Sequence, residues 1–190
     1  ATKIEDLQSY VDENLDLFSK VLNSLESVSE EAKSYLVEKT TKDGRIDNAL
    51  LEKYQYEGHG FAWFETYRIS LRETLNWYKS LKDINKSSKL ESGILIFAFS
   101  EYLTQMRNGI MMSQTEVVRP SILGISQESF SFYESPDVAN LIKIGSSDSV
   151  KDEIVSSLEN GIFPNLGLND ETLEMIQDQF KKFTDEEIIP

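Results

Sequence analysis

The run Ser88–Gly109, SKLESGILIFAFSEYLTQMRNG, decides the fold class of this 190-residue chain. Its middle, Ile94–Phe99, is continuously apolar, which suits either a buried strand or a buried helix. Ser88 and Glu91 have the spacing of a capping box, and Asn108-Gly109 is typical of a helix C-terminus. Because the run is also about 20 residues long and has no evident partner strand, it predicts a buried helix.

The N-terminal third continues the helical pattern. Apolar residues three and four positions apart predict a first helix that starts at a Thr2–Glu5 capping box and reaches Leu25. A shorter helix is expected to begin at Ser29 and to end at the turn Thr40–Gly44. The longest pattern opens at Asp47 and runs to about Leu81.

Two features stand out within that longest pattern. The stretch Phe61–Phe64 is apolar on all sides, so we expect it to be buried all round. Gly58 and Gly60 weaken a helix locally, which indicates either a break between two helices or a close approach of another backbone.

The sequence after Gly109 is richer in turn residues. Ile110–Ser135 predicts a long ordered connection without a hairpin, in which Ser113–Glu116 would cap one short helical turn. Ser135-Pro136 and Ser149 are expected to start two short helices, the second with its apolar side chains inward, and a linker covers 161–168. The inward set of that second helix is Val150, Ile154, Val155 and Leu158.

The C-terminal segment Asn169–Pro190, NDETLEMIQDQFKKFTDEEIIP, predicts an amphipathic helix. Asn169 is the expected N-cap, and acidic residues occupy the first turn. One stripe of this helix is apolar and must be buried against something. Its members are Leu173, Ile176, Phe180 and Phe183.

The composition of the chain excludes several classes of binding partner and chemistry. The net charge of −14 is concentrated at the two ends of the chain, and such a surface repels nucleic acid and disfavours capture of polyanionic coenzyme A. The absence of cysteine excludes disulfides and thiolate chemistry. No membrane-spanning run or signal sequence is evident, so we expect no membrane association and a cytoplasmic location.

Residues that could carry chemistry are few. His59 is the only histidine, so metal sites and histidine-dependent catalysis have little to use. We expect a buried histidine that is hydrogen-bonded across a helix crossing, and the alternative is a site where Gly58 and Gly60 let a ligand come close. Ser113, Gln114, Glu116 and Arg119 resemble a polar pocket, but without a base near Ser113 we expect capping and an ion pair of Glu116 or Arg119 instead. No glycine-rich phosphate loop is present. We therefore assign no catalytic, cofactor-binding or metal residue, and keep these five as polar candidates.

Several segments together resemble a known family. Tyr56–Trp63 (YEGHGFAW), Glu101–Leu103, Gly109–Glu116 (GIMMSQTE) and Val118–Pro120, followed by the terminal helix, resemble the N-terminal extension of the methylsuccinyl-CoA dehydrogenase-like acyl-CoA dehydrogenases. The resemblance covers roughly residues 45–190. It implies a parent flavoenzyme that oxidises the Cα–Cβ bond of an acyl-CoA thioester with FAD and a catalytic Glu, none of which matches positions in this chain.

The resulting hypothesis is an all-α chain with an antiparallel bundle of four or more helices. We expect the bundle in 1–125, a connection with two short helices in 126–168, and the first helix of a following catalytic body in 169–190. The function expected is accessory and structural, without catalysis by this chain itself. Its expected partners are the downstream catalytic domain and further copies in a homo-oligomer. The alternatives are a free-standing helical module that binds a protein or an apolar ligand, and an independent enzyme. Without its partner, the 169–190 stripe would be disordered, folded back, or buried against another copy.

Overall fold

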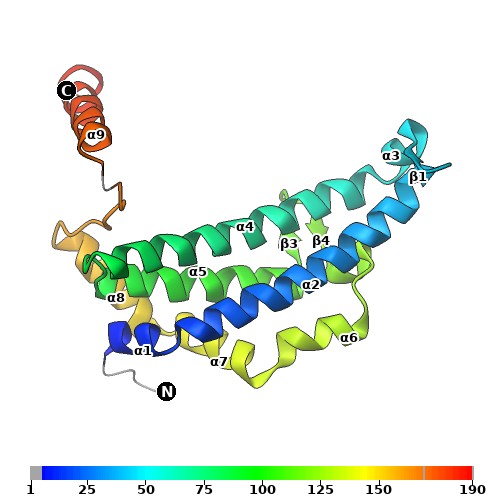
Figure 1. Ribbon diagram of the computed structural model, residues 1–190, viewed down its shortest axis with the longest axis horizontal. Helices are drawn as coiled ribbons and strands as arrows, with labels where there is room; N and C mark the ends of the chain where they lie inside the picture. The colour runs from blue at the N-terminus through cyan, green and yellow to red at the C-terminus, as the bar shows by residue number, and fades with distance from the viewer. Residues whose placement is uncertain (1–5, 169, 190) are drawn as a thin grey trace.

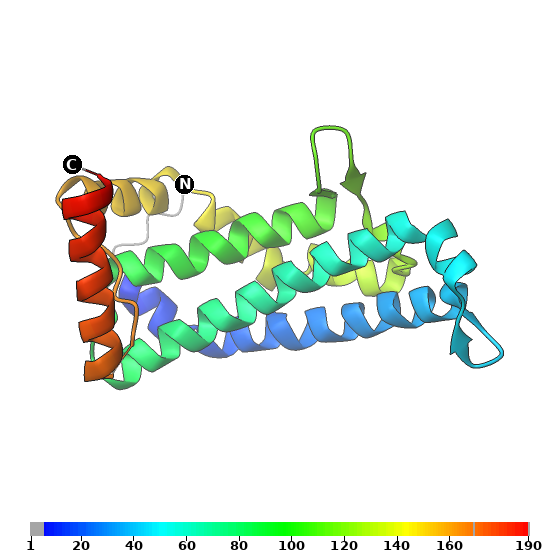
Figure 2. The same cartoon turned by 90° about the horizontal axis from the view of Figure 1, so that it is seen from above.

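The computed structural model describes residues 6–168 and 170–189 and confirms the predicted all-α bundle (Figure 1). Its frame is three long helices, α2 (Leu15–Thr40), α4 (Gln55–Asp83) and α5 (Lys89–Asn108). They pack α2 on α4 and α4 on α5, and short turns make successive helices antiparallel (Figure 2). With 29 residues in α4, the bundle is about 40 Å long.

The N-terminal boundaries differ from the expected ones. Helix α1 (Leu7–Glu13) is capped by the Asp6 carboxylate, and the Thr2–Glu5 capping box lies outside the described residues. The chain bends at Asn14, and α2 then continues without interruption through Ser29. The predicted helix start at Ser29 was wrong because this buried serine donates its hydroxyl to Glu65 of α4 and does not act as a cap.

A small hairpin joins α2 to the next helices. Strands β1 (Thr41–Lys42) and β2 (Arg45–Ile46) pair antiparallel. The turn residues Asp43 and Gly44 have φ values of 51° and 73°, the left-handed conformation that a two-residue hairpin turn of type I′ requires. The predicted turn is confirmed, but two-residue strands are too short to give the alternating pattern that would have predicted the hairpin.

The long pattern from Asp47 is two helices. Asp47 caps α3 (Asn48–Lys53), and the chain bends at Tyr54 before α4 begins. Helix α4 runs straight through both glycines, so no break occurs there. Phe64 is buried but Ala62 is exposed, so the expectation of burial on every side of 61–64 was wrong. Only one side of α4 faces the core.

Helix α5 matches its prediction. Ser88 and Glu91 form the reciprocal capping box, and Gly109 ends the helix at a φ of 132°. A second hairpin follows, in which β3 (Ile110–Met111) pairs antiparallel with β4 (Val117–Val118). The hairpin corrects the expectation that 110–135 contains none.

The remaining connection winds back along the bundle. It contains the 3₁₀ turns η1 (Pro120–Leu123) and η2 (Ser131–Glu134), with the one-turn helix α6 (Gln127–Phe130) between them. Helix α7 (Pro136–Gly145) starts with the predicted Ser135 cap and first-turn proline, and helix α8 (Asp148–Glu159) follows it.

Both of these helices pack against α5. Gly145 lets α7 come close, because a side chain there would overlap the Ile96 carbonyl and Ser100. The Ser100 hydroxyl donates to the Ile142 carbonyl at 2.9 Å. In α8, Val150 is buried as expected, but Val155 and Leu158 are exposed, since this helix lies at the edge of the bundle.

The core fills the space between α2, α4, α5 and α7. Phe18 of α2 and Phe99 of α5 meet edge to face with ring centroids 4.9 Å apart, and both side chains are fully buried. Tyr78 is also fully buried, with its hydroxyl 3.0 Å from Asp12 and 2.9 Å from Ser92. Burial raises the pKa of Tyr78 to about 12, so it remains a neutral hydrogen-bonding group.

The chain leaves the bundle through residues 161–168, which contain no regular secondary structure, as predicted. Helix α9 (Glu171–Phe183) and the π-helical turn η3 (Thr184–Ile188) then stand apart from the bundle at one end (Figures 1 and 2). Among the helices of the described ranges, none combines the length and apolar character needed to cross a membrane.

Candidate functional site

His59 is exposed on the surface of α4. Its Nε2 accepts a hydrogen bond of 3.0 Å from the indole nitrogen of Trp63, one turn later on the same helix. The expectation of a buried histidine bonded across a helix crossing was therefore wrong. The inward positions of this part of α4 are Gly60 and Phe64, and His59 is rotated about 100° away from Gly60.

Gly60 is where another segment comes close. A side chain at this buried position would overlap the side chain of Val118 in β4, whose Cβ would lie 3.0 Å from it. The Tyr56 hydroxyl donates to the Val117 carbonyl at 3.0 Å. A close approach therefore occurs at Gly60, but it is made by the Val118 side chain and not by a backbone, as the second alternative had it. This contact brings the 56–63 and 109–120 motifs together.

The loop between β3 and β4 holds three of the polar candidates, Ser113, Gln114 and Glu116, all exposed. The Ser113 hydroxyl donates to Glu116 at 3.1 Å, and the Met112 amide donates to the Glu116 carbonyl at 2.8 Å. These contacts close a hairpin loop, so the predicted capped helical turn was wrong. The Glu116 carboxylate thus accepts from Ser113, and among the ion pairs of the described residues neither Glu116 nor Arg119 takes part, so the expected ion pair was wrong.

Arg119 lies away from the Ser113–Glu116 loop. It is exposed after β4 and lines a shallow pocket of about 220 Å³ together with Arg107 from the end of α5. The structure thus joins Ser113 with Glu116 but gathers no single site from His59, the loop and Arg119. Within 6–168 and 170–189, no cluster of three or more acidic or histidine side chains has the arrangement to hold a metal ion.

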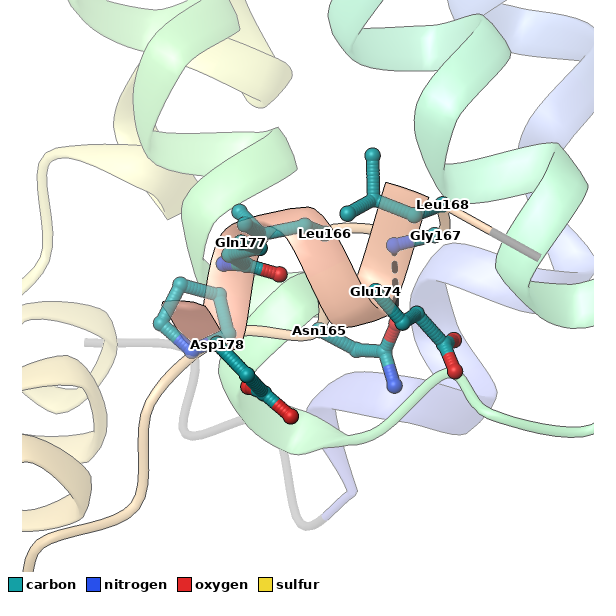
Figure 3. A pocket seen from close by; sticks show the side chains of 8 residues that line it. Asn165, Leu166, Gly167, Leu168, Glu174, Gln177 and Asp178 are labelled. Carbon is teal, nitrogen blue, oxygen red and sulfur yellow. Dashed lines mark hydrogen bonds between the residues drawn. The ribbon is translucent and has the colours of Figure 1, made fainter. Parts of the chain in front are cut away.

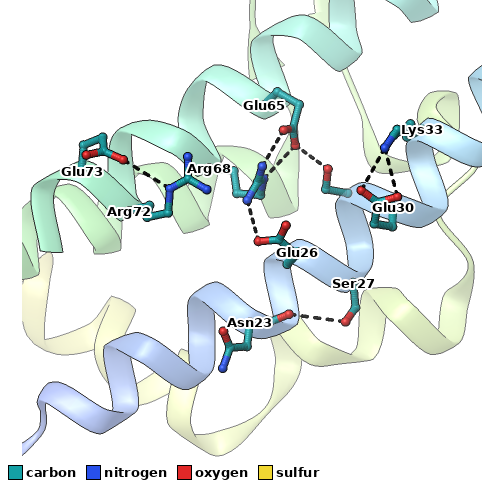
Figure 4. A network of polar contacts seen from close by, with 10 residues as sticks. Asn23, Glu26, Ser27, Glu30, Lys33, Glu65, Arg68, Arg72 and Glu73 are labelled. Carbon is teal, nitrogen blue, oxygen red and sulfur yellow. Dashed lines mark hydrogen bonds and ion pairs between the residues drawn. The ribbon is translucent and has the colours of Figure 1, made fainter. Parts of the chain in front are cut away.

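A polar network that the sequence pattern did not predict joins α2 to α4 (Figure 4). Arg68, which is 8% exposed, forms two hydrogen bonds with Glu65, at 2.9 and 2.8 Å, and one of 2.8 Å with Glu26 of α2. Burial acts to raise the pKa of Glu65, but hydrogen bonds from Arg68 and Ser29 lower it below its ordinary value. The only sequence signal was the three-residue spacing of Glu65 and Arg68.

The linker is anchored to the bundle at Asn165. The Trp77 indole donates to the Asn165 carbonyl at 2.8 Å, and the Asn165 amide donates to the buried Glu91 carboxylate at 2.9 Å. The Asn165 side chain then accepts from the Gly167 amide at 2.8 Å (Figure 3). These three bonds fix the point from which the chain departs toward α9, and we call them the Asn165 anchor.

Helix α9 turns its polar side toward the linker. Glu174, Gln177 and Asp178 line a pocket of about 320 Å³ with residues 164–168 (Figure 3). The apolar stripe lies on another side of the helix and is exposed, with Ile176 at 47% and Phe180 at 69%. The expected N-cap Asn169 lies outside the described residues, and the Asp170 carboxylate caps the helix.

Exposed apolar residues are concentrated in this part of the chain. Of the 19 large apolar side chains that are exposed among the described residues, 13 lie between Val155 and Ile189. Upstream of Val155 the exposed ones are scattered, whereas these 13 follow one another along α8, the linker, α9 and η3. Exposed apolar side chains in such numbers are typical of a segment that contacts another protein surface. The candidate functional site of the described residues is therefore a docking surface.

Comparison with known proteins agrees with the family resemblance. No family model matches the chain. The chain is, however, similar over most of its length to part of an acyl-CoA dehydrogenase. That relative is the (2S)-methylsuccinyl-CoA dehydrogenase of Cereibacter sphaeroides, with 37% identity over 180 residues. The match covers 93% of this chain and 32% of the dehydrogenase, so the chain spans about a third of the relative's length. The predicted resemblance is confirmed.

Proposed function

We propose that this chain is the N-terminal accessory domain of an FAD-dependent acyl-CoA dehydrogenase that works in the cytoplasm. The helical bundle braces the catalytic body or supports its subunit contacts, and α9 is the first helix of that body. The match to about a third of a longer dehydrogenase favours this function over a free-standing interaction module. The proposed parent oxidises the Cα–Cβ bond of an acyl-CoA thioester.

The observation that carries the proposal is the exposed stripe of α9. The bundle closes its own core without α9, with Leu71, Leu95 and Phe99 fully buried. Helix α9 keeps Phe180 and Phe183 more than half exposed. Burying a Phe or Ile side chain stabilises a protein by roughly 1.5–3 kcal/mol, so a stripe of four such residues favours a packing partner. A following catalytic domain supplies one.

The pockets named here within residues 6–168 and 170–189 do not have the lining that FAD needs. The depression at the charged β1–β2 turn has a volume of about 560 Å³, is open to solvent, and is lined by Lys42, Asp43 and Arg45 among others. The glycines form no phosphate-binding loop, and the net charge of −14 opposes a pyrophosphate. We therefore place FAD and the catalytic Glu in the remainder of the dehydrogenase and assign no reaction step to residues 1–190.

The test compares the 190-residue chain with the full-length dehydrogenase. Flavin absorbance and acyl-CoA oxidation are expected in the full-length protein only. In that protein Ile176→Asp should lower flavin retention and turnover at least about tenfold, because it places a charge in a buried contact. Met175→Asp is the matched control, since Met175 is the neighbouring apolar residue and lies about 100° away around the helix. Flavin bound to the 190-residue chain, or equal effects of the two substitutions, would contradict the proposal.

A further inference from the structure

An apolar groove lies beside the Asn165 anchor, on the bundle and not on α9. It has a volume of about 360 Å³ and is formed by α4, α5 and the linker. Its lining consists of Glu73, Thr74, Trp77, Ile94, Pro164 and Leu166. Leu166 is 57% exposed and the adjacent Phe163 is 73% exposed, so the rim is apolar as well.

The Asn165 anchor holds this groove open. Pro164 and Leu166 flank Asn165, whose backbone is fixed by Trp77 on one side and by Glu91 on the other. Gly167 lies next to Leu81 at the end of α4, where a side chain would have its Cβ 3.2 Å from Leu81. The wall that the linker contributes is therefore attached to α4 and α5 by hydrogen bonds and close packing. A preformed apolar groove needs little reorganisation to receive a side chain.

We propose that this groove is a second contact for the catalytic domain of the same polypeptide and that it receives an apolar side chain of that domain. This inference rests on the proposed function. Leu166 of the groove belongs to the same run of exposed apolar residues as the α9 stripe, so a partner that covers this run covers both. The relative is about three times as long as this chain, which gives such a partner ample size.

Two contacts separated by an anchored linker have a physical consequence. A single helix stripe leaves the bundle free to swing about the linker, whereas a second contact fixes its orientation. The catalytic domain then packs on the α9 stripe on one side of the linker and contacts the groove on the other.

Thiol labelling tests the groove, because the chain contains no cysteine of its own. Thr74→Cys places a thiol in the groove, Phe180→Cys places one on the α9 stripe, and Ile46→Cys, in β2 at the opposite end of the bundle, is the control. Labelling by a maleimide is measured peptide by peptide with mass spectrometry, in the 190-residue chain and in the full-length holoenzyme. In the holoenzyme Thr74→Cys should be labelled at least about tenfold more slowly than in the chain, and Ile46→Cys equally fast.

The outcomes separate this inference from the proposed function. If Phe180→Cys is protected in the holoenzyme but Thr74→Cys is not, the groove contact is wrong and the accessory function stands. If neither is protected, both fail. Protection of Thr74→Cys already in the 190-residue chain would assign the groove to α9 or to a second copy and overturn the inference.

A second variant guards against indirect protection. Adding Leu166→Asp to Thr74→Cys should restore labelling in the holoenzyme to within about threefold of the rate in the chain, because a charge on the groove wall opposes an apolar occupant. Leu51→Asp, at an exposed leucine of α3, should leave the protection intact. An equal response to the two aspartates would overturn the proposed occupant.

Discussion

Helices α4 and α9 carry the same kind of amphipathic pattern and have opposite environments. On α4, Phe64 and Leu71 are 1% and 0% exposed, whereas on α9 Ile176 and Phe180 are 47% and 69% exposed. Helix α4 lies between α2 and α5, and α9 is carried past the end of the bundle by a linker anchored at Asn165. An apolar stripe therefore shows that a helix face needs a packing partner, but it does not identify that partner.

The largest expected difference comes from one substitution made in both regions of the 190-residue chain. Phe99→Ala in the core should lower the free energy of unfolding by about 3–5 kcal/mol, because it leaves a cavity against Phe18. Phe180→Ala on α9 should change it by less than about 0.5 kcal/mol. Urea unfolding followed by circular dichroism measures both.

The Phe180→Ala variant also tests the comparison in the full-length dehydrogenase that we propose. There Phe180→Ala should become destabilising by about 2–4 kcal/mol if the catalytic body covers the stripe. A Phe180→Ala protein as stable as the unmodified dehydrogenase would show that α9 has no packing partner.

A substitution in the Arg68 network should give the next largest change in the free energy of unfolding. Glu65→Gln should lower the free energy of unfolding by about 1–3 kcal/mol, because it leaves the buried Arg68 guanidinium without its main carboxylate partner. The folded pKa of Glu65 lies below its ordinary value of 4.5, so its contribution is complete above that pH and is lost as the pH falls through the folded pKa. Urea unfolding from about pH 7 to about pH 3 should show a smaller acid loss in Glu65→Gln. Glu73→Gln, on the exposed Arg72 pair, is the control.

Two glycines of α4 provide a matched pair, because their replacement by alanine should change the stability of the chain in opposite directions. Gly60→Ala should destabilise the chain by about 1–3 kcal/mol, because the new methyl overlaps Val118 and the stiff β-branched side chain cannot move aside. Gly58→Ala meets no atom within 4 Å and should stabilise α4 by up to about 1 kcal/mol. Thermal unfolding of the two variants checks both signs, and equal shifts would refute the close approach of β4.

His59→Ala should have the smallest effect. Removing an exposed imidazole whose hydrogen bond is to Trp63 on its own helix should change the unfolding free energy by less than about 0.5 kcal/mol. Turnover of the full-length dehydrogenase should also remain within about twofold. Loss of turnover with intact folding would make His59 a functional residue and end its assignment as a surface group.

The sequence predicted the helices best where local signals agreed. The cap at Ser88, the glycine at position 109 and the proline at 136 define the ends of α5 and the start of α7 by local backbone chemistry, and all three are confirmed. Prediction failed where a residue serves a distant partner. Ser29 has the chemistry of a cap but bonds Glu65, and Ser113 closes a hairpin that depends on strand pairing.

The candidate site was only partly predictable for the same reason. The α9 stripe and its amphipathic character follow from residue spacing, but its exposure depends on the direction in which the linker leaves the bundle. That direction is fixed by Trp77, Glu91 and Asn165, which are far apart in the sequence and carry no common pattern. His59 was expected inside because it lies among aromatic residues, yet a rotation of about 100° from Gly60 places it outside.

The sequence by itself determined the all-α class, the principal caps and which helix faces are apolar, because these depend on backbone propensity and on residues three or four positions apart. Only the tertiary structure decided which faces meet, that Arg68 takes a place in the core stripe, that β4 lies against Gly60, and that α9 remains uncovered within the described chain. These outcomes depend on long-range packing, in which one side chain's environment is set by residues that the local pattern does not contain.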